Sequence, residues 1–274
     1  MIISKKEKRI VLVVFISLFI IFTFYDLNFS NWIVNRESLF GQFFYVFGEL
    51  PGTFIGLVSL SILSVSGINS KKQTINFYGF GLLSFVMSFV IMYRTLNYLD
   101  INLFPLIGLG VFPPIILIYT LNQLSDEKKI HLRKYAVVGV LTLIVGVLVP
   151  NLVKIGWARP RYRILDTTVL FKVWYNPSGF TLNDDWKSFP SGHSAAAAIS
   201  LVYLYLPQLF ERLRGKEKWI KLFVWVWIIL VMLSRVVRGD HYVTDTLVGA
   251  GFTYYVFVYL HQRFIEKSKK YSKC

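Results

Sequence analysis

The sequence predicts an all-α protein, a polytopic transmembrane helical bundle of about eight membrane helices. Of its 274 residues, 55% are hydrophobic and only 16% are charged, and the mean hydropathy is +0.54. A soluble domain of this length could not bury so much apolar surface, so lipid must cover part of it. Apolar runs close to the ~20 residues that cross a bilayer recur along the whole chain. The placement of basic residues between these runs is the third observation.

Eight apolar runs are the expected membrane helices. They lie at residues 10–25, 51–65, 75–93, 103–121, 135–153, 194–210, 219–233 and 242–264. The run at 51–65 is short, and Pro105, Pro113 and Pro114 interrupt another, so these two are the weakest members of the set. The first run follows a basic tip, as in a signal peptide, but no small-residue cleavage site follows it. We therefore expect it to remain as a membrane helix.

The basic residues predict a cytoplasmic location for both chain ends. When the N-terminus is placed inside and sides alternate, most of the 30 lysines and arginines fall in inner segments. These inner groups lie at residues 5–9, 71–72, 128–134, 212–221 and 263–273. This asymmetry follows the positive-inside rule and explains the net charge of +15 without nucleic acid as a partner. Six of the ten outer basic residues stand in two of the three stretches described below, at Lys154–Arg163 and at Arg235–Arg238. The three stretches are expected at the outer face.

Three regions are expected along the chain: N-terminal membrane helices at 1–134, a core with the three stretches at 135–264, and a basic cytoplasmic tail at 265–274. The one long hydrophilic connection runs from Arg159 to Pro190 and is rich in aromatic residues, as a cap at the lipid–water interface would be. The single cysteine, Cys274, excludes an internal disulfide and a cysteine-based metal site.

The stretch from Ser234 to Asp245 joins two apolar runs and organises the rest of the chain. His241 and Asp245 are four residues apart, so on a helix they share one face. Asp245 could then accept the Nδ1–H of the imidazole and leave Nε2 free as a nucleophile, with Arg235 beside it to bind an anion. These side chains suit phosphoryl transfer through a phosphohistidine. A chance polar loop is the alternative interpretation.

Two further stretches lie on the same side. Ser191, Gly192 and His193 open the sixth run, where the hydroxyl can donate to an anion and the glycine lets a phosphate approach the backbone. His193 can protonate a leaving oxygen as a general acid, although a plain helix cap at Ser191 is an equal alternative. At the end of the fifth run, basic side chains are either helix-end anchors or phosphate ligands: Lys154, Arg159, Arg161 and Arg163.

Together, the three stretches resemble the signature of the type 2 phosphatidic acid phosphatase superfamily of integral-membrane lipid phosphatases. That signature is Lys, six residues, Arg-Pro; then Pro-Ser-Gly-His; then Ser-Arg, five residues, His, three residues, Asp. The second and third parts match at every specified position. In the first part Lys154 and Arg161 have the usual spacing, but Tyr162 stands where proline is usual, and Arg159-Pro160 is an alternative at shorter spacing. Spacing favours Arg161. The resemblance covers about residues 141–260.

The resemblance implies a phosphatidic acid phosphatase-type core and a division of roles. His241 attacks phosphorus, Asp245 orients it, and His193 protonates the leaving lipid oxygen. The implied phosphate ligands are Lys154, Arg161, Ser191, Gly192 and Arg235, with Arg159 and Arg238 as further candidates. Neither a metal nor another cofactor is implied.

The expected function is hydrolysis of a lipid phosphate or diphosphate at the extracytoplasmic face of a bacterial plasma membrane. Undecaprenyl diphosphate, a cell-wall carrier lipid, is the first expected substrate, followed by phosphatidic acid and phosphatidylglycerophosphate. The expected partners are this lipid and the bilayer, while the oligomeric state is left open. Two alternatives remain. A phosphotransferase would use the same phosphohistidine with another acceptor, and a non-catalytic transporter of phosphate lipids would not need His193, His241 and Asp245 in register.

Overall fold

The computed structural model describes residues 2–67, 70–102, 104–165 and 170–267, so residues 268–274 of the expected tail lie outside the described residues. Within those ranges the chain forms helices and no strand, which confirms the all-α prediction. The α-helices are α1 (Lys5–Ile33), α2 (Leu39–Phe47), α3 (Leu50–Val65), α4 (Ser70–Tyr98), α5 (Leu106–Asn122), α6 (Asp126–Trp157), α7 (Gly192–Ala198), α8 (Leu206–Leu209), α9 (Glu217–Val237) and α10 (Val243–His261).

Short helical segments complete the chain. They are the 3₁₀ segments η1 (Tyr162–Ile164), η3 (Asp184–Trp186), η4 (Ile199–Tyr205) and η5 (Glu211–Leu213), and the π-helical η6 (Gln262–Glu266). The segments α7, η4 and α8 follow one another without a break and correspond to the run expected at 194–210. Among the described residues, each of the eight expected runs overlaps a helical segment, although α1 extends well beyond its apolar part.

Five helical stretches of the described chain are long and apolar enough to cross a membrane. They are Lys5–Ile33, Leu39–Val65, Gln73–Tyr98, Asp126–Ile164 and Glu217–Val237, while α5 is apolar but shorter. In α1 the apolar side chains Ile20 and Phe24 are exposed, whereas Asp26 and Ser30 are the buried residues. A helix in contact with lipid is expected to have apolar side chains that face outward and polar side chains that face inward. The protein is an integral membrane protein with a helical bundle.

The segment α7–η4–α8 lies at the centre of the bundle and contacts α3, α6, α9 and α10. Close packing here depends on small residues. A Cβ on Gly249 would lie 2.2 Å from the carbonyl oxygen of Ser191, and one on Gly52 would lie 1.9 Å from that of Ala196. Glycine at these two positions therefore brings α10 and α3 against the start of the central segment. The main hydrophobic core includes Tyr205 of this segment, packed together with Phe257 of α10 and Ile228 of α9.

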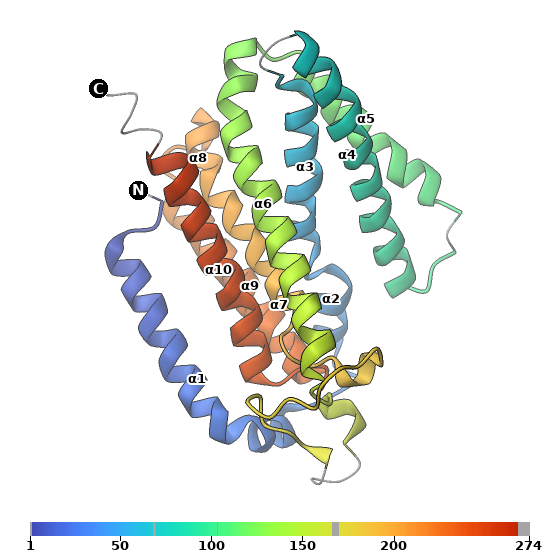
Figure 1. Cartoon of the computed structure of the whole chain (residues 1–274), viewed down its shortest axis with the longest axis vertical. Helices are drawn as coiled ribbons and strands as arrows, with labels where there is room; N and C mark the ends of the chain where they lie inside the picture. Colours follow the sequence, from blue (N-terminus) through green and yellow to red (C-terminus); the bar gives the residue numbers. More distant parts are fainter. Residues whose placement is uncertain (1, 68–69, 103, 166–169, 268–274) are drawn as a thin grey trace.

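The start of α1 and the end of α10 lie towards one end of the bundle, and the three reactive stretches lie at the other (Figure 1). The loop that follows α6, the turn between α9 and α10, and α2 all gather at this second end. The loop is tied to its neighbours through Trp174, which accepts a hydrogen bond from Trp157 with its carbonyl (2.5 Å) and donates one to Thr23 with its indole (3.0 Å). The gathering of these stretches at one end agrees with the alternation of inner and outer segments expected from the charge pattern. Which end of the bundle faces the cytoplasm stays a prediction.

Candidate active site

One polar cavity of about 420 Å³ brings the three stretches together. Its wall includes side chains from the end of α6, the loop that follows, the start of α7 and the α9–α10 junction: Lys154, Arg161, Arg163, Asp184, Gly192, His193, Arg235 and His241. Tyr45, Glu49, Arg94 and Tyr98 add to it from the N-terminal half. Sequence positions far apart therefore share one chamber at one end of the bundle.

His241 is 1% exposed and its ring is fixed by the loop before α7. Its Nδ1 lies 2.6 Å from the carbonyl oxygen of Ser188. A carbonyl can only accept, so Nδ1 carries the proton and Nε2 keeps its lone pair. Burial lowers the pKa of the His241 imidazole to about 3, and the cations of Lys154, Arg161 and Arg235 add to this effect. The ring is therefore neutral at pH 7, as a nitrogen nucleophile must be.

Asp245 acts on His241 through Ser188 rather than by the direct hydrogen bond expected from the spacing. Its Oδ2 lies 3.8 Å from Nδ1 of His241, which is too long for a hydrogen bond. The same oxygen accepts from the Ser188 hydroxyl at 2.5 Å and from the Tyr242 amide at 2.9 Å. Asp245 therefore fixes the residue whose carbonyl orients the His241 ring.

Arg159 belongs to this buried group and not to the cavity wall. Its guanidinium donates to Asp245 at 2.5 Å and to Asp26 at 3.1 Å, and its carbon lies 4.1 Å from the centre of the Tyr242 ring. Thr244 and the carbonyl of Lys172 accept its remaining hydrogen bonds. We call this set the Asp245 cluster: Asp26, Arg159, Ser188, Thr244 and Asp245. Of the two alternative arginines, Arg161 is the one that lines the cavity.

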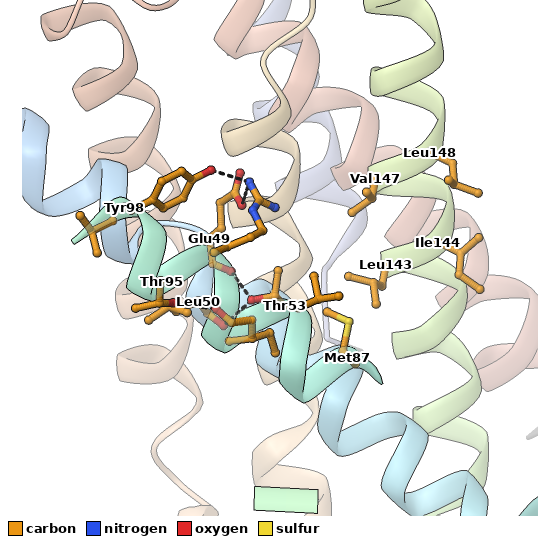
Figure 2. Close-up of a pocket in the computed structure, with 14 residues that line it drawn as sticks. Glu49, Leu50, Thr53, Met87, Thr95, Tyr98, Leu143, Ile144, Val147 and Leu148 are labelled. Carbon is orange, nitrogen blue, oxygen red and sulfur yellow. Dashed lines mark hydrogen bonds and ion pairs between the residues drawn. The ribbon is translucent and has the colours of Figure 1, made fainter. Parts of the chain in front are cut away.

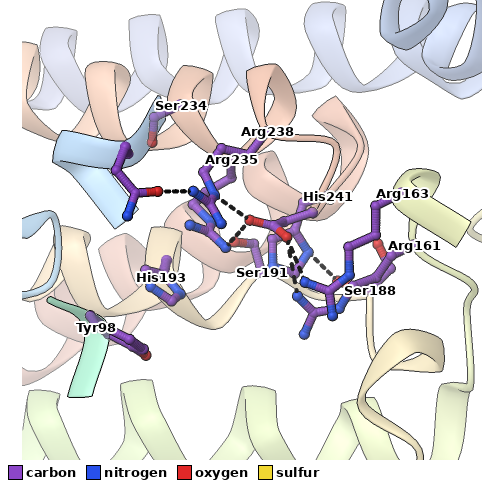
Figure 3. A network of polar contacts seen from close by, with 12 residues as sticks. Tyr98, Arg161, Arg163, Ser188, Ser191, His193, Ser234, Arg235, Arg238 and His241 are labelled. Carbon is purple, nitrogen blue, oxygen red and sulfur yellow. Dashed lines mark hydrogen bonds and ion pairs between the residues drawn. The ribbon is translucent and has the colours of Figure 1, made fainter. Parts of the chain in front are cut away.

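A second set, the Asp240 cluster, consists of Asp240, Arg161, Arg163, Arg235 and Arg238. Four guanidinium groups converge on this one carboxylate (Figure 3). The nearest nitrogens lie 2.6 Å away for Arg235, 2.9 Å for Arg163, 3.0 Å for Arg238 and 3.7 Å for Arg161. Burial alone would raise the pKa of Asp240, but Arg235 and its neighbours hold it well below the usual range. Asp184 and Asp185 also pair with Arg161 and Arg163, but the four guanidinium groups still outnumber the three carboxylates, so the cluster keeps an excess of positive charge.

Arg235 presents unused donors within this cluster. Its Nη2 is paired with Asp240, but its Nε and Nη1 are buried and have no hydrogen-bond partner among the described residues. Buried donors of this kind are costly unless a ligand satisfies them. Arg238 differs, because it pairs with Asp240 and Gln42 and lies over the Tyr45 ring without lining the cavity. Of the two arginines, Arg235 is therefore the one that lines the cavity and has unpaired donors.

Of the two phosphate ligands expected at the start of α7, one lines the cavity and the other does not. Gly192 lines the cavity, and a Cβ there would lie 3.2 Å from Nζ of Lys154, so that ammonium sits against the glycine. Ser191 instead caps the helix. Its Oγ accepts from the amide of Ser194 at 3.3 Å and from the Ser194 hydroxyl at 3.0 Å, and Ser191 is absent from the cavity wall. The helix-cap interpretation of Ser191 is the one that the structure supports.

Comparison with known proteins identifies a family for this chain. Residues 135–268 match the family model described as the PAP2 superfamily. The chain belongs to this superfamily. Its members are generally phosphatases, which points to phosphatase-type chemistry on lipid phosphates. Searches of curated proteins and of solved structures return no match.

The PAP2 region supplies the three stretches, but other residues of the cavity come from the helices before it. Glu49, at the start of α3, places Oε1 3.0 Å from Nδ1 of His193. The opposite ring nitrogen, Nε2, is buried and unpartnered among the residues that the structure describes. Neither Glu49 nor Asp26 was singled out from the sequence. Both are acidic residues in apolar surroundings, and a charge at that depth is a signal of function or pairing.

A second, apolar cavity of about 290 Å³ adjoins the polar one between α3, α4 and α6 (Figure 2). Leu50, Met87, Leu143 and Leu148 are among its lining residues. The two cavities share wall residues: Glu49, Thr53, Arg94, Tyr98 and Val147. Charged and hydrocarbon surfaces therefore meet, as a ligand with an anionic head and an apolar chain requires.

In the described part of the chain, no three His, Cys, Asp or Glu side chains are placed to hold one metal ion. The charged residues of the cavity wall are mostly lysine and arginine, with Glu49 and Asp184 as the carboxylates among them.

Proposed function

We propose that this protein is a lipid phosphatase that works without a metal through a phosphohistidine on His241. The observation that carries the proposal is the shared cavity, where two histidines and the unpaired donors of Arg235 surround one space. The adjoining apolar cavity supports a substrate with a hydrocarbon chain. Membership of the PAP2 superfamily agrees with the reaction class.

In the first step the lone pair on Nε2 of His241 forms a bond to phosphorus. The bond from phosphorus to the lipid oxygen breaks, and its electron pair stays on that oxygen. His193 gives its Nε2 proton to the oxygen, so a lipid alcohol leaves, or a lipid monophosphate if the substrate is a diphosphate. Lys154, Arg161 and Arg235 stabilise the charge that spreads over the phosphoryl oxygens.

In the second step water attacks phosphorus. The bond between phosphorus and Nε2 of His241 breaks, and its electron pair returns to the nitrogen. His193, now neutral, takes a proton from the water, and inorganic phosphate leaves. The carbonyl of Ser188 holds the Nδ1 proton of His241 throughout, which keeps the ring in one tautomer.

Among substrates we place undecaprenyl diphosphate first, followed by phosphatidic acid and phosphatidylglycerophosphate. The charge pattern supports a site on the extracytoplasmic side, where such a carrier lipid needs a phosphatase. The basic wall fits either a monoester or a diphosphate, since arginine and lysine pair with phosphate oxygens in both.

A phosphate-release assay on the purified protein in detergent with EDTA tests the proposal. We expect release from several lipid phosphates without any added acceptor, and a loss of several orders of magnitude in His241→Ala and His193→Ala. His131→Ala is the matched control, because His131 is exposed and lies near the other end of α6. Activity that needs a metal, or full activity in His241→Ala, contradicts the mechanism.

The orientation has its own test. In a Cys274→Ser background, a cysteine at the exposed position Asn183 reports which side the reactive end faces. We expect labelling by an impermeant thiol reagent in intact cells. Labelling only after lysis would place the site inside.

A further inference from the structure

We infer that Glu49 is a positioning residue for His193, the general acid, and that Arg94 holds Glu49 in place. The inference rests on the proposed function, because it concerns the same reaction. Both residues precede residue 135 and so lie outside the PAP2 match. The N-terminal helices would then complete the catalytic apparatus of the core.

The Glu49 carboxylate uses its two oxygens for two different partners. Oε1 lies 3.0 Å from Nδ1 of His193, and Oε2 lies 2.7 Å from a guanidinium nitrogen of Arg94. Arg94 also donates to the Tyr98 hydroxyl at 2.8 Å (Figure 2). A chain of contacts thus runs from α4 through the start of α3 to the start of α7, and it fixes the carboxylate in one orientation.

Two aromatic rings that contact each other, those of Tyr45 and Tyr98, pack beside the imidazole of His193. The Tyr45 ring is stacked on it at a centroid distance of 5.8 Å and an interplanar angle of 15°, and the Tyr98 ring lies at 6.1 Å. An ionised carboxylate only accepts, so Nδ1 of His193 carries a proton. The unpartnered Nε2 is therefore the nitrogen that exchanges a proton with the substrate or with water.

Glu49 also has an electrostatic role. His193 shares the cavity with Lys154, Arg161 and Arg235, whose positive charges oppose a protonated imidazole. The carboxylate of Glu49 is the anion in direct contact with the ring. An acid that must give up a proton to a leaving oxygen has to hold that proton first, and Glu49 favours this state.

Leaving-group dependence separates positioning from simple folding. A lipid phosphomonoester with an alkyl leaving group needs the proton from His193, whereas the nitrophenolate of p-nitrophenyl phosphate leaves readily without one. Both substrates are measured on the same preparation of the full-length protein, so the ratio of the two rates does not depend on how much protein is folded. The variants are Glu49→Gln, Glu49→Asp and Arg94→Gln, with Glu37→Gln as the exposed control.

In Glu49→Gln we expect kcat for the lipid substrate to fall by about 10–10²-fold, a part of the roughly 10²–10⁴-fold that general acid catalysis contributes. KM should change little, and the nitrophenyl substrate should lose less than about threefold, since its departure needs no acid. Glu49→Asp keeps the carboxylate and should therefore restore part of the ratio of the lipid rate to the nitrophenyl rate. In Arg94→Gln this ratio should lie between the values for Glu49→Gln and for the unchanged protein.

An equal loss on both substrates in Glu49→Gln would show a structural role and overturn the inference, as would an unchanged ratio. The proposed function fails by a different result, namely turnover of both substrates by His241→Ala. His193→Ala should show the same substrate dependence as Glu49→Gln with a larger loss. Because His193 also takes a proton from water in the second step, its acid role is measured as release of the leaving group in the first turnover; if His193→Ala lowers that rate equally for both substrates, His193 is not the acid and Glu49 loses its role with it.

Discussion

The Asp245 cluster and the Asp240 cluster are built from the same residue types but differ in how their charges are balanced. In the Asp245 cluster a single guanidinium, that of Arg159, meets two buried carboxylates, and its nitrogens all have acceptors. In the Asp240 cluster a single buried carboxylate meets four guanidinium groups, and Arg235 retains two unpaired nitrogens. We call the Asp245 cluster closed, because every guanidinium nitrogen of Arg159 has an acceptor. We call the Asp240 cluster open, because Arg235 lines the cavity with unpaired nitrogens.

The difference teaches that the balance of arginine and carboxylate decides what a buried cluster does. A buried charge with its partners satisfied joins helices, and removing one partner is expensive. Arginines in excess over carboxylates leave donors for an external anion, such as a phosphoryl group. Proximity in the sequence does not distinguish the two cases, since Arg159 and Arg161 are two residues apart and fall into different clusters.

The largest effect is expected when the closed cluster is broken. Arg159→Ala leaves Asp26 and Asp245 buried without their cation, which should cost about 3–5 kcal/mol of unfolding free energy. Thermal unfolding in detergent, followed by tryptophan fluorescence, measures the loss. Adding Asp26→Asn should recover part of it, because one uncompensated charge is removed. An unchanged midpoint in Arg159→Ala would mean that the cluster is not needed for the fold.

Breaking the open cluster should affect catalysis instead. Arg235→Ala is expected to lower kcat/KM by about 10²–10³-fold, as for other preorganised donors to a transition state. The unfolding midpoint should stay close to that of the unchanged protein, because Asp240 keeps Arg163 and Arg238. Arg238→Ala is the matched control and should lose less activity, as Arg238 does not line the cavity. Equal losses in the two variants would erase the distinction.

Inorganic phosphate should stabilise the protein through the open cluster alone. At a concentration about 100 times its Kd, a ligand of the folded state adds about 2.7 kcal/mol to the unfolding free energy. We expect a raised midpoint in the unchanged protein and in Arg238→Ala, and no shift in Arg235→Ala, with chloride at equal ionic strength as the reference. A shift of equal size in Arg235→Ala would place the phosphate elsewhere.

The smallest expected effect concerns the titration of His241, whose ring is close to residues of both clusters. Its pKa is lowered to about 3, so the ring is protonated only as pH falls towards that value and stays neutral above it. Nitrogen NMR, assigned by difference from His241→Gln, should show a neutral ring with its proton on Nδ1 down to about pH 5. A titration near the ordinary value of about 6.5 would show that neither burial nor the surrounding cations lower the pKa of this ring.

The sequence predicts most of the fold, because membrane helices are specified by local composition. Within the described chain the apolar runs all overlap helices, and alternation of the runs sets the end of the bundle at which the reactive stretches meet. The changes of helix type in the central segment, where the 3₁₀ turns of η4 lie between α7 and α8, have no such local signal. They arise where the segment packs against four helices at once.

For the site, the sequence predicts the residues whose spacing is fixed by a helix start or end, such as Lys154, Gly192 and His241. It misses Asp26 and Glu49, because each pairs with a residue distant in the chain; Asp26 and Arg159 are 133 positions apart. It also misjudges the contact of Asp245, since helical spacing cannot reveal that the Ser188 carbonyl reaches Nδ1 of His241 first. Pairing across the bundle becomes visible only once the helices are packed.

The apolar cavity beside the charged one has a consequence for selectivity. A hydrocarbon tail that passes from the bilayer into this space exchanges one oily environment for another, so the transfer releases no hydrophobic free energy. Lengthening the tail should therefore add little to affinity, and discrimination among lipids must come from their shape near the mouth of the cavity and from their headgroups. Tolerance of many hydrocarbon tails then follows from the bilayer that surrounds the protein.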